Sequence, residues 1–330
     1  MPTPSEPERN SEFGLGTPPP RRSVFGNYRP EAEPSPAVPS ANGGGRPAAR
    51  PEQSASEGAV GCGAQPSAIQ PTLQCQIDTA LARSFLCRFL AKAFEDPDPA
   101  GWRWLTDERT RAAVDAVATT LAGNGGLRTA AETLLRHLDP GDFDSFHRDH
   151  VICFGHTVRG DCPMNEIEYG DLKADPLFQP HRLADLGAFY TAFGLELAPD
   201  AAERQDHISI ELEFLSVLAA REAYALEHQF DEEPIAIGRE AQKAFLREHL
   251  GRWSPAFTRR LGRMAGDTAL GALAGFTREF ILAECARLGV PPGSEDLLLR
   301  PIDESASTLC ASCGINNLPP GAIRSPVENS

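Results

Sequence analysis

The stretch that decides the fold is residues 200–222, which read DAAERQDHISIELEFLSVLAARE. On a helix that turns by about 100° per residue, its apolar side chains gather on one wide arc. These residues are Ile208, Ile210, Leu212, Phe214, Leu215, Val217, Leu218 and Ala219. Because so wide an apolar arc has to be covered by other apolar groups, the pattern predicts a helix buried in the core of a helical domain.

Two ionisable residues, His207 and Glu211, lie inside this apolar arc. Burial of an unpaired charge is costly, so each of them needs a partner. Their spacing of four residues lets them pair with each other, and such a buried pair fixes the orientation of a helix without chemistry. Asp206 lies at the edge of the arc. Residues 200–203 have the form of a capping box, in which Glu203 satisfies backbone donors, so we expect the helix to start there.

Amphipathic helical patterns recur from residue 72 onward and are separated by Gly, Pro and Asp. The predicted helices run from 72 to a break at 96–99 and then cover 107–122, 127–138, 142–154, 181–193, 200–222, 233–249, 255–264 and 268–288. No convincing series of alternating strands is present. The sequence therefore predicts an all-α protein, with a single compact multi-helix domain at residues 71–292.

The two ends of the chain have a different character. Residues 1–70 hold 13 of the 29 prolines and many Gly, Ser and Ala, so they cannot bury enough apolar surface to offset their ordering entropy. We predict a disordered extension there and a flexible tail at 293–330. The extension contains Arg21-Arg22-Ser23-Val24-Phe25, which resembles a twin-arginine export signal in outline. Polar residues 26–30 follow where such a signal needs an apolar stretch, so we interpret the arginines as a chance pair.

Composition and charge disfavour several classes of function. The chain has 330 residues and a net charge of −15, so a nucleic-acid backbone is an unsuitable partner. An apolar run of roughly 18 residues is absent, so we expect no stable membrane insertion. The eight cysteines are scattered without a disulfide-like framework, which indicates reduced thiols in the cytoplasm.

One alternative is a metal-binding enzyme on a helical bundle, because Glu203, Asp206, His207 and Glu211 lie close together in the sequence. Di-metal centres in bundles take a Glu-x-x-His pair from each of two helices. The chain contains no Glu-x-x-His at all. We therefore expect no catalytic residue, no metal and no cofactor at this helix.

A second metal candidate is the Cys-x-x-Cys formed by Cys310 and Cys313. A structural zinc or iron–sulfur site needs about four ligands, and the chain has no second Cys-x-x-Cys. Metal binding or redox chemistry by this pair remains an alternative to two idle thiols, which is the interpretation that the ligand count favours.

Three segments resemble one known family. Residues 183–190 (LADLGAFY) and 192–195 (AFGL) resemble the helix and turn of the TorD/DmsD/NarJ chaperones. Residues 203–207 (ERQDH), with the apolar run after them, resemble the Glu-Pro-x-Asp-His signature of that family, although Arg204 stands where proline is common. Residues 162–170 (CPMNEIEYG) are similar to a loop in one branch of it, and functional residues are frequent on such loops. The resemblance covers residues 73–292.

The resemblance implies a redox-enzyme maturation chaperone that is cytoplasmic, all-helical and non-catalytic. Such proteins bind the apo form of a molybdoenzyme catalytic subunit, often at its twin-arginine leader peptide, and assist cofactor insertion and assembly before export. They exist as monomers or homodimers. By carry-over, Asp206 and His207 lie at the peptide-binding surface, and we expect them to be exposed at the start of the helix, beside the loop 162–170. The alternative within this class is an assembly subunit that never meets a leader peptide.

A leader peptide offers two guanidinium groups and an apolar segment, so its receptor should offer carboxylates beside an apolar groove. The residues that we expect to bind the peptide are Asp206, His207, Glu203, Tyr169, Glu166, Glu168 and Tyr190, with Phe193 also lining the groove. We assign Glu211 and Phe214 structural roles inside the domain. All of these residues flank one loop and the start of one helix.

Overall fold

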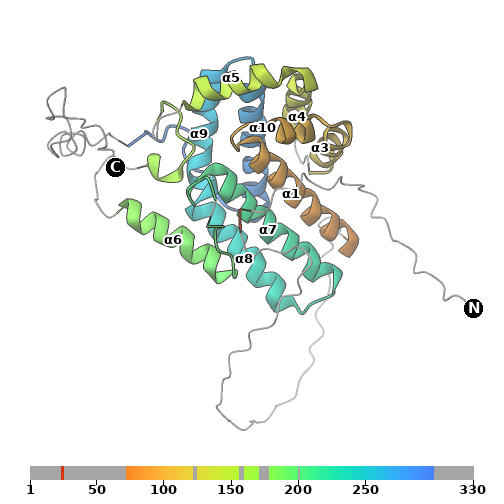
Figure 1. The fold of residues 1–330 in the computed structure, drawn as a ribbon. Coiled ribbons are helices and arrows are strands. Elements are labelled where there is room, and N and C mark those ends of the chain that lie inside the picture. The colour runs from red at the N-terminus through yellow and green to blue at the C-terminus, as the bar shows by residue number, and fades with distance from the viewer. Residues whose placement is uncertain are drawn as a thin grey trace, which may run out of the picture.

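The computed structural model describes residues 24–25, 72–121, 125–155, 160–170, 178–199 and 201–300. These residues form ten α-helices and two short 3₁₀ helices, and their β contacts are three isolated bridges (Figure 1). The all-α fold predicted from the sequence is therefore confirmed. The predicted disordered extension lies outside the described residues except at 24–25. Cys310 and Cys313, with the rest of the tail beyond residue 300, also lie outside them.

The helices are named in chain order. They are α1 (Leu73–Ala93), α2 (Pro99–Thr106), α3 (Glu108–Leu121), α4 (Gly126–His137), η1 (Pro140–Asp142), α5 (Phe143–Phe154), η2 (Glu166–Glu168), α6 (Phe178–Ala192), α7 (Ile208–Glu227), α8 (Glu232–Glu248), α9 (Leu250–Ala265) and α10 (Ala269–Leu288). Nine of the α-helices overlap helices predicted from the sequence, and α2 is the exception.

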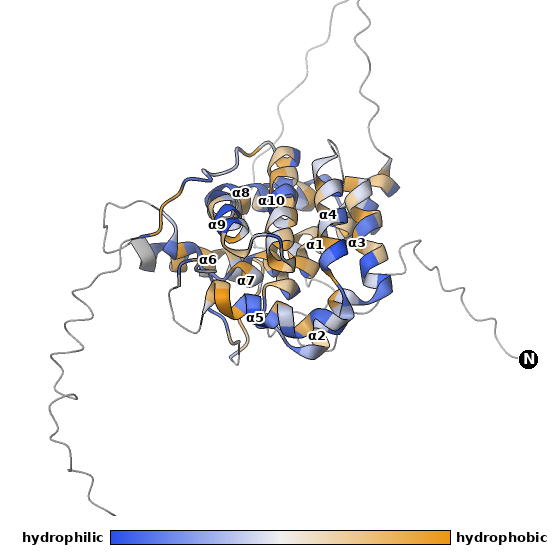
Figure 2. Cartoon of the chain, turned by 90° about the horizontal axis from the view of Figure 1, so that it is seen from above, coloured by the Kyte–Doolittle hydropathy of each residue, from blue (hydrophilic) through white to orange (hydrophobic). Residues whose placement is uncertain are grey.

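The centre of the domain is α7, as its apolar arc predicts. Leu212, Phe214 and Leu215 have no exposed surface. The most extensive helix contact among the described residues is that of α7 with α1, which lies beside it (Figure 1). Peripheral helices such as α2 and α3 carry both polar and apolar residues, as expected when one face of a helix meets the core (Figure 2).

The start of α7 differs from the prediction. The helix begins at Ile208, and the ring of His207 caps it by accepting a hydrogen bond from the backbone N–H of Ser209 at 3.3 Å. On either side of His207, the backbone groups of Asp206 and Ile208 pair with the loop before α6 instead of extending the helix toward residue 200. The N–H of Ile208 donates to the carbonyl of Met164 at 2.9 Å, for example. The capping box predicted at 200–203 is therefore wrong, because a tertiary pairing has displaced the helix start.

The predicted break at 96–99 is also a helix start. The side chain of Asp98 accepts hydrogen bonds from the backbone N–H groups of Ala100 and Gly101, at 2.9 and 3.0 Å. Pro99 then occupies the first turn of α2, where the missing N–H has no helical partner to lose. A motif that ends one helix thus begins the next.

The helix α9 begins five residues earlier than predicted and passes through Pro255. A proline inside a helix leaves the carbonyl four residues before it without its usual donor. Here that carbonyl belongs to Gly251 and accepts a hydrogen bond from the backbone N–H of Gly293 at 2.9 Å. The chain just after α10 thus supplies the missing bond, and the first residues of the predicted flexible tail are attached to the domain.

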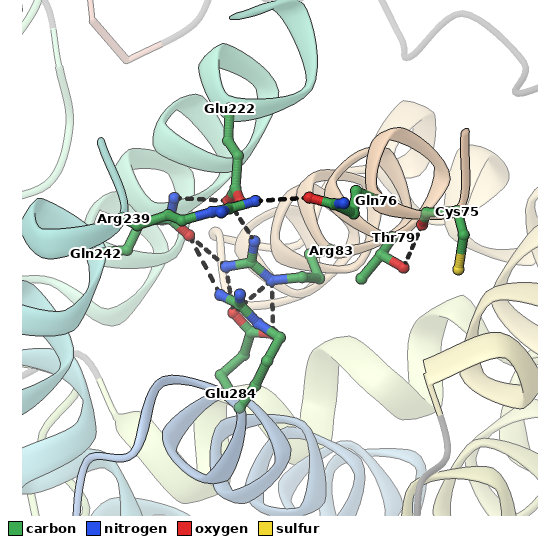
Figure 3. Close-up of polar contacts among 9 residues, drawn as sticks. Cys75, Gln76, Thr79, Arg83, Glu222, Arg239, Gln242 and Glu284 are labelled. Atoms are coloured by element: carbon green, nitrogen blue, oxygen red, sulfur yellow. Dashed lines mark hydrogen bonds and ion pairs between the residues drawn. The ribbon is translucent and has the colours of Figure 1, made fainter. Parts of the chain in front are cut away.

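A buried guanidinium joins four helices of the core. Arg83 of α1 is 1% exposed, and it donates hydrogen bonds to both carboxylate oxygens of Glu284 on α10, at 2.8 and 2.7 Å (Figure 3). It also donates to Glu222 on α7 at 3.0 Å and to the side-chain carbonyl of Gln242 on α8. The sequence patterns gave no indication of this network.

The charges of this network hold one another in their ionised forms. Burial by itself would raise the pKa of Glu284, but the charge and hydrogen bonds of Arg83 and the charge of Arg287 hold that pKa below its ordinary value. Burial likewise opposes ionisation of Glu222, and Arg83 and Arg239 keep its pKa low. Removing Arg83 would therefore leave buried carboxylates with fewer partners.

Candidate functional site

The candidate site lies where the loop 160–170 meets the start of α7. Asn165 and His207 form an antiparallel bridge, and the backbone N–H of Glu166 donates to the carbonyl of Asp206 at 2.9 Å. The loop and the family-like signature, which lie about 40 residues apart in the sequence, are therefore in direct contact. This convergence could not be read from sequence spacing alone.

The carboxylate of Asp206 is enclosed by this contact. It has no exposed surface, and it accepts hydrogen bonds from Asn165 Nδ2 and the backbone N–H of Ile167, both at 3.2 Å. Arg204 donates to both of its oxygens, with Nη2 at 3.0 Å from Oδ2. The arginine that replaces the family's common proline therefore neutralises Asp206. The expectation that Asp206 is exposed is wrong, because its oxygens hold the loop in place.

His207 is also buried, with 2% of its surface exposed, so the expectation that it lies at an exposed helix start is wrong as well. Burial, with the neighbouring His150 and Arg204, lowers its pKa to about 3, so the ring is neutral at pH 7. Its Nδ1 lies 2.7 Å from the hydroxyl of Ser209. Its Nε2 has no hydrogen bond and lies 3.8 Å from Glu203 Oε2.

The predicted pairing of His207 with Glu211 is not formed. The carboxylate of Glu211 instead accepts from Trp253 Nε1, at 3.2 and 3.1 Å to its two oxygens. Burial and the nearby charge of Glu166 raise the pKa of Glu211 well above its ordinary value. Glu211 therefore faces α9. A helical wheel places Glu211 on the buried side of α7, but it cannot show which helix packs there.

The two glutamates of the loop also turn inward. Glu166 has no exposed surface, and its carboxylate accepts from His249 Nδ1 at 2.9 Å and from Arg252 Nη2 at 3.0 Å. Glu168 is 8% exposed. Neither carboxylate lies open at the surface, and that of Glu166 is held by residues at the start of α9.

Glu203 is the member of the predicted acidic set that reaches solvent. Its side chain is 36% exposed. Burial, with the neighbouring carboxylates of Asp96 and Glu95, raises its pKa. A positive group bound here would relieve that repulsion. Among the four predicted carboxylates, Glu203 is thus the one whose geometry suits a guanidinium ligand.

Both predicted tyrosines are buried and use their hydroxyls internally. Tyr169 Oη donates to the carbonyl of Pro163 at 2.8 Å, and its ring packs on Trp253 with centroids 5.2 Å apart. Tyr190 Oη donates to the carbonyl of Gln205 at 2.8 Å, which holds the segment before α7 against α6. Tyr169 therefore holds the loop from the buried side. The hydroxyl of Tyr190 is used in the same way, and its ring makes a separate aromatic contact.

That contact is an aromatic slot, which we define by Tyr190, Leu197 and Phe214. Phe25 fills it and is 1% exposed, with its ring centroid 5.2 Å from that of Tyr190 and 6.2 Å from that of Phe214. Phe25 also forms an antiparallel bridge with Leu197. The short red segment beside α7 in Figure 1 is this docked chain. The extension predicted to be disordered thus has a fixed place at residues 24–25.

Backbone bonds hold the neighbouring residue, Val24, in an extended conformation. Its carbonyl accepts from the backbone N–H of Ala198 at 2.7 Å, and its own N–H donates to Glu213 Oε2 at 3.4 Å. Sequence reasoning missed Leu197, Glu213 and Phe25 as site residues. The only signal was the motif at 21–25, which the following polar residues caused us to set aside.

The receiving edge of the slot is built by the turn after α6. Gly194 has a φ of 67°, a left-handed conformation that glycine adopts without strain. The N–H of Leu195 donates back to the carbonyl of Tyr190 at 2.9 Å, which closes the helix with a Schellman-type turn. The chain then continues to Leu197 and Ala198, whose backbone pairs with residues 24–25.

Among the described residues, no group of three or more His, Cys, Asp and Glu side chains is arranged to hold a metal ion. In that same part of the chain, none of the helices is both long and apolar enough to cross a bilayer.

The fold and the site together define a class of protein. It is all-α, the carboxylates of Asp206, Glu166 and Glu211 are buried and hydrogen-bonded within the domain, and its aromatic slot holds an extended segment. The family model described as the nitrate reductase delta subunit matches residues 122–259. A selenate reductase assembly chaperone protein of Thauera selenatis is 38% identical over 210 residues, which are 64% of this chain and 90% of that relative. A chlorate reductase assembly chaperone protein of Ideonella dechloratans is 36% identical over 110 residues, or 33% of this chain and 54% of that relative.

The chain therefore belongs to the TorD/DmsD/NarJ family of redox-enzyme maturation chaperones. The resemblance inferred from the signature and its surroundings is confirmed. As a member of this family, the protein is an assembly chaperone and not an enzyme.

Proposed function

We propose that this chaperone binds the apo form of a molybdoenzyme catalytic subunit, at its twin-arginine leader peptide, in the cytoplasm. It holds that subunit while the cofactor is inserted, before export. The names of the two relatives support a reductase as the client. Leader binding is supported by one observation: the aromatic slot accepts a phenylalanine from an extended segment, which is how an apolar peptide residue docks beside an exposed backbone edge.

Charge complements the slot. Glu203 and Glu213 are partly exposed carboxylates that border the first half of α7. The raised pKa of Glu203, caused by burial and by Asp96 and Glu95, describes a site where an arriving cation lowers the electrostatic energy. Guanidinium groups suit carboxylates because they donate in a planar fork. We assign the leader arginines to this acidic border and the apolar residue after them to the slot.

The buried residues of the signature support this binding surface indirectly. Asp206 holds the loop through Ile167 and Asn165, and Tyr190 holds the segment that carries Glu203 through Gln205. Substitution of Asp206 or His207 therefore acts on folding as well as on binding. The sharper test uses Glu203, whose carboxylate is exposed enough to be changed without opening the core.

The experiment measures binding of a fluorescently labelled twin-arginine leader peptide to the full chain by anisotropy. A matched peptide has both arginines replaced by glutamine. Glu203→Gln should weaken binding of the arginine peptide about tenfold, since a charge-assisted hydrogen bond is lost, and should not affect the glutamine peptide. The control is Glu132→Gln, because Glu132 is an exposed carboxylate on α4 with an i,i+4 partner. Equal binding of the two peptides would refute leader recognition and favour an assembly subunit that contacts the folded client elsewhere.

A further inference from the structure

The segment docked in the aromatic slot belongs to this same chain, and we propose that it is an internal competitor of the client's leader peptide. In this proposal, Phe25 occupies the slot in the resting chaperone, and a leader displaces it. The proposal rests on the leader binding proposed above, and it adds a regulatory role for the N-terminal extension. In this proposal, Arg21 and Arg22 belong to the competing segment.

The first support is the completeness of the docking. Phe25 is 1% exposed, although the three residues that define the slot lie far from it in the sequence. Its ring meets Tyr190 edge-on at an interplanar angle of 72° and lies tilted against Phe214 at 59°. T-shaped and tilted arrangements of this kind are favourable for aromatic pairs. The geometry of the slot therefore suits an aromatic side chain.

The second support is the order of the residues. In the sequence, two arginines stand three and four positions before Phe25, so the segment offers a cation pair followed by an apolar pair, Val24-Phe25. A twin-arginine leader offers the same order. The polar residues 26–30 then stand where a leader has its long apolar stretch. The segment thus carries the part of a leader that a receptor recognises and lacks the part that directs export.

The third support is the direction of the docked chain. The N–H of Val24 faces Glu213, and its carbonyl faces Ala198. The amino end of the docked pair therefore lies beside an acidic group on α7. An incoming leader with its arginines before its apolar residue would bind in the same direction. The two ligands then require the same carboxylate and the same slot, so they exclude each other.

The docked segment makes few contacts, so its binding to the slot can be reversible. Two backbone hydrogen bonds and one inserted ring are replaceable contacts, and 46 residues separate Phe25 from Thr72 at the start of the helical domain. A segment that is linked covalently to its own binding site has an effective concentration on the order of 1 mM. With an intrinsic dissociation constant on the order of 0.1 mM, the segment lowers the apparent affinity for a leader about tenfold.

The test compares three full-length proteins: the unchanged chain, Phe25→Ala, and Phe13→Ala as a matched phenylalanine control in the same extension. Labelled peptide 18–30 should bind Phe25→Ala with a submillimolar dissociation constant and bind the other two proteins at least about fivefold more weakly. The same peptide carrying alanine in place of its phenylalanine should bind none of them. A twin-arginine leader peptide should bind Phe25→Ala about tenfold more tightly than the unchanged chain.

A second measurement needs no substitution. The backbone N–H of Val24 donates to Glu213, so hydrogen exchange at Val24 should be slow in the unchanged chain and should accelerate by at least about tenfold when an added leader peptide displaces the segment. It remains decisive if Phe25→Ala does not fold. Protection that rises with protein concentration would overturn the proposal, because a second copy would then supply the docked segment.

The outcomes also separate this proposal from the proposed function. If the leader binds the unchanged chain and Phe25→Ala with equal affinity, while peptide 18–30 binds neither, the internal competitor is refuted and leader binding stands. If peptide 18–30 binds Phe25→Ala but no leader binds either protein, leader recognition fails and the competitor role fails with it.

Discussion

The most incisive stability prediction concerns the buried network of Arg83, because a single substitution there affects four helices. In Arg83→Met the side chain keeps much of its length and loses its charge. Breaking a buried ion pair by removing one partner costs about 3–5 kcal/mol, since the other partner stays buried. Arg239 and Arg287 remain beside Glu222 and Glu284, so we expect the lower end of that range, about 3 kcal/mol.

The assay is urea unfolding of the full chain, and the loss of helix is followed by far-ultraviolet circular dichroism. Arg128→Met is the matched control, because Arg128 forms an exposed i,i+4 pair with Glu132 on α4. Exposed pairs of this kind contribute about 0–1 kcal/mol. The two variants should therefore differ by at least about 2 kcal/mol in unfolding free energy.

The pH dependence gives this prediction an independent check. In the unchanged chain, the lowered pKa values of Glu222 and Glu284 contribute stability that is lost as the pH falls through them. Without Arg83, burial is opposed mainly by Arg287, so we expect the folded-state pKa of Glu284 to rise. The variant then loses less stability on protonation than the unchanged chain, so its deficit should shrink between pH 7 and pH 5. A deficit equal to that of Arg128→Met, or one that does not change with pH, would refute the reasoning.

Three further predictions follow from individual sites. His207→Asn keeps a capping acceptor and removes a ring whose pKa is lowered to about 3. Below pH ~6.5, the unfolding free energy of the variant should therefore fall less steeply with acid than that of the unchanged chain, and the two slopes should differ by about 1.4 kcal/mol per pH unit. Equal slopes in urea unfolding would argue against a neutral buried ring. Glu211→Gln still accepts from Trp253, and because the raised pKa makes the native carboxyl lose stability as pH rises, the variant's advantage in melting temperature should grow from pH 5 to pH 8. Gly194→Ala, at φ 67°, should cost about 1–2 kcal/mol and speed hydrogen exchange at Ala198, whereas an unchanged exchange rate would separate the turn from the slot.

The candidate site shows how far a family-like signature can guide residue assignment. The sequence brought attention to the right region, because the loop 160–170 and the residues before α7 do touch. It could not say which way the side chains point. Asp206 and Glu166 carry the charges expected of a guanidinium receptor, yet each is enclosed by cations of this chain. The spacing of residues along the chain shows which of them lie near a helix start. The direction in which their side chains point depends on the segments that pack there.

What the sequence determined by itself is the helical architecture and the buried character of α7. Periodicity is a local property: residues 208–219 present one apolar surface whatever the neighbours are, and apolar surface of that width is buried. The glycines and prolines between the helices act locally too, so most helix boundaries followed from them.

Only the tertiary structure decided the start of α7, the partners of Arg83 and the place of Phe25. Each depends on which distant segments become neighbours: α10 for Arg83, residues 164–166 for the helix start, and the turn after α6 for Phe25. A buried charge needs partners, and an exposed backbone edge accepts a strand. Neither requirement determines which segment of the chain satisfies it. That choice is made by the packing of the whole domain.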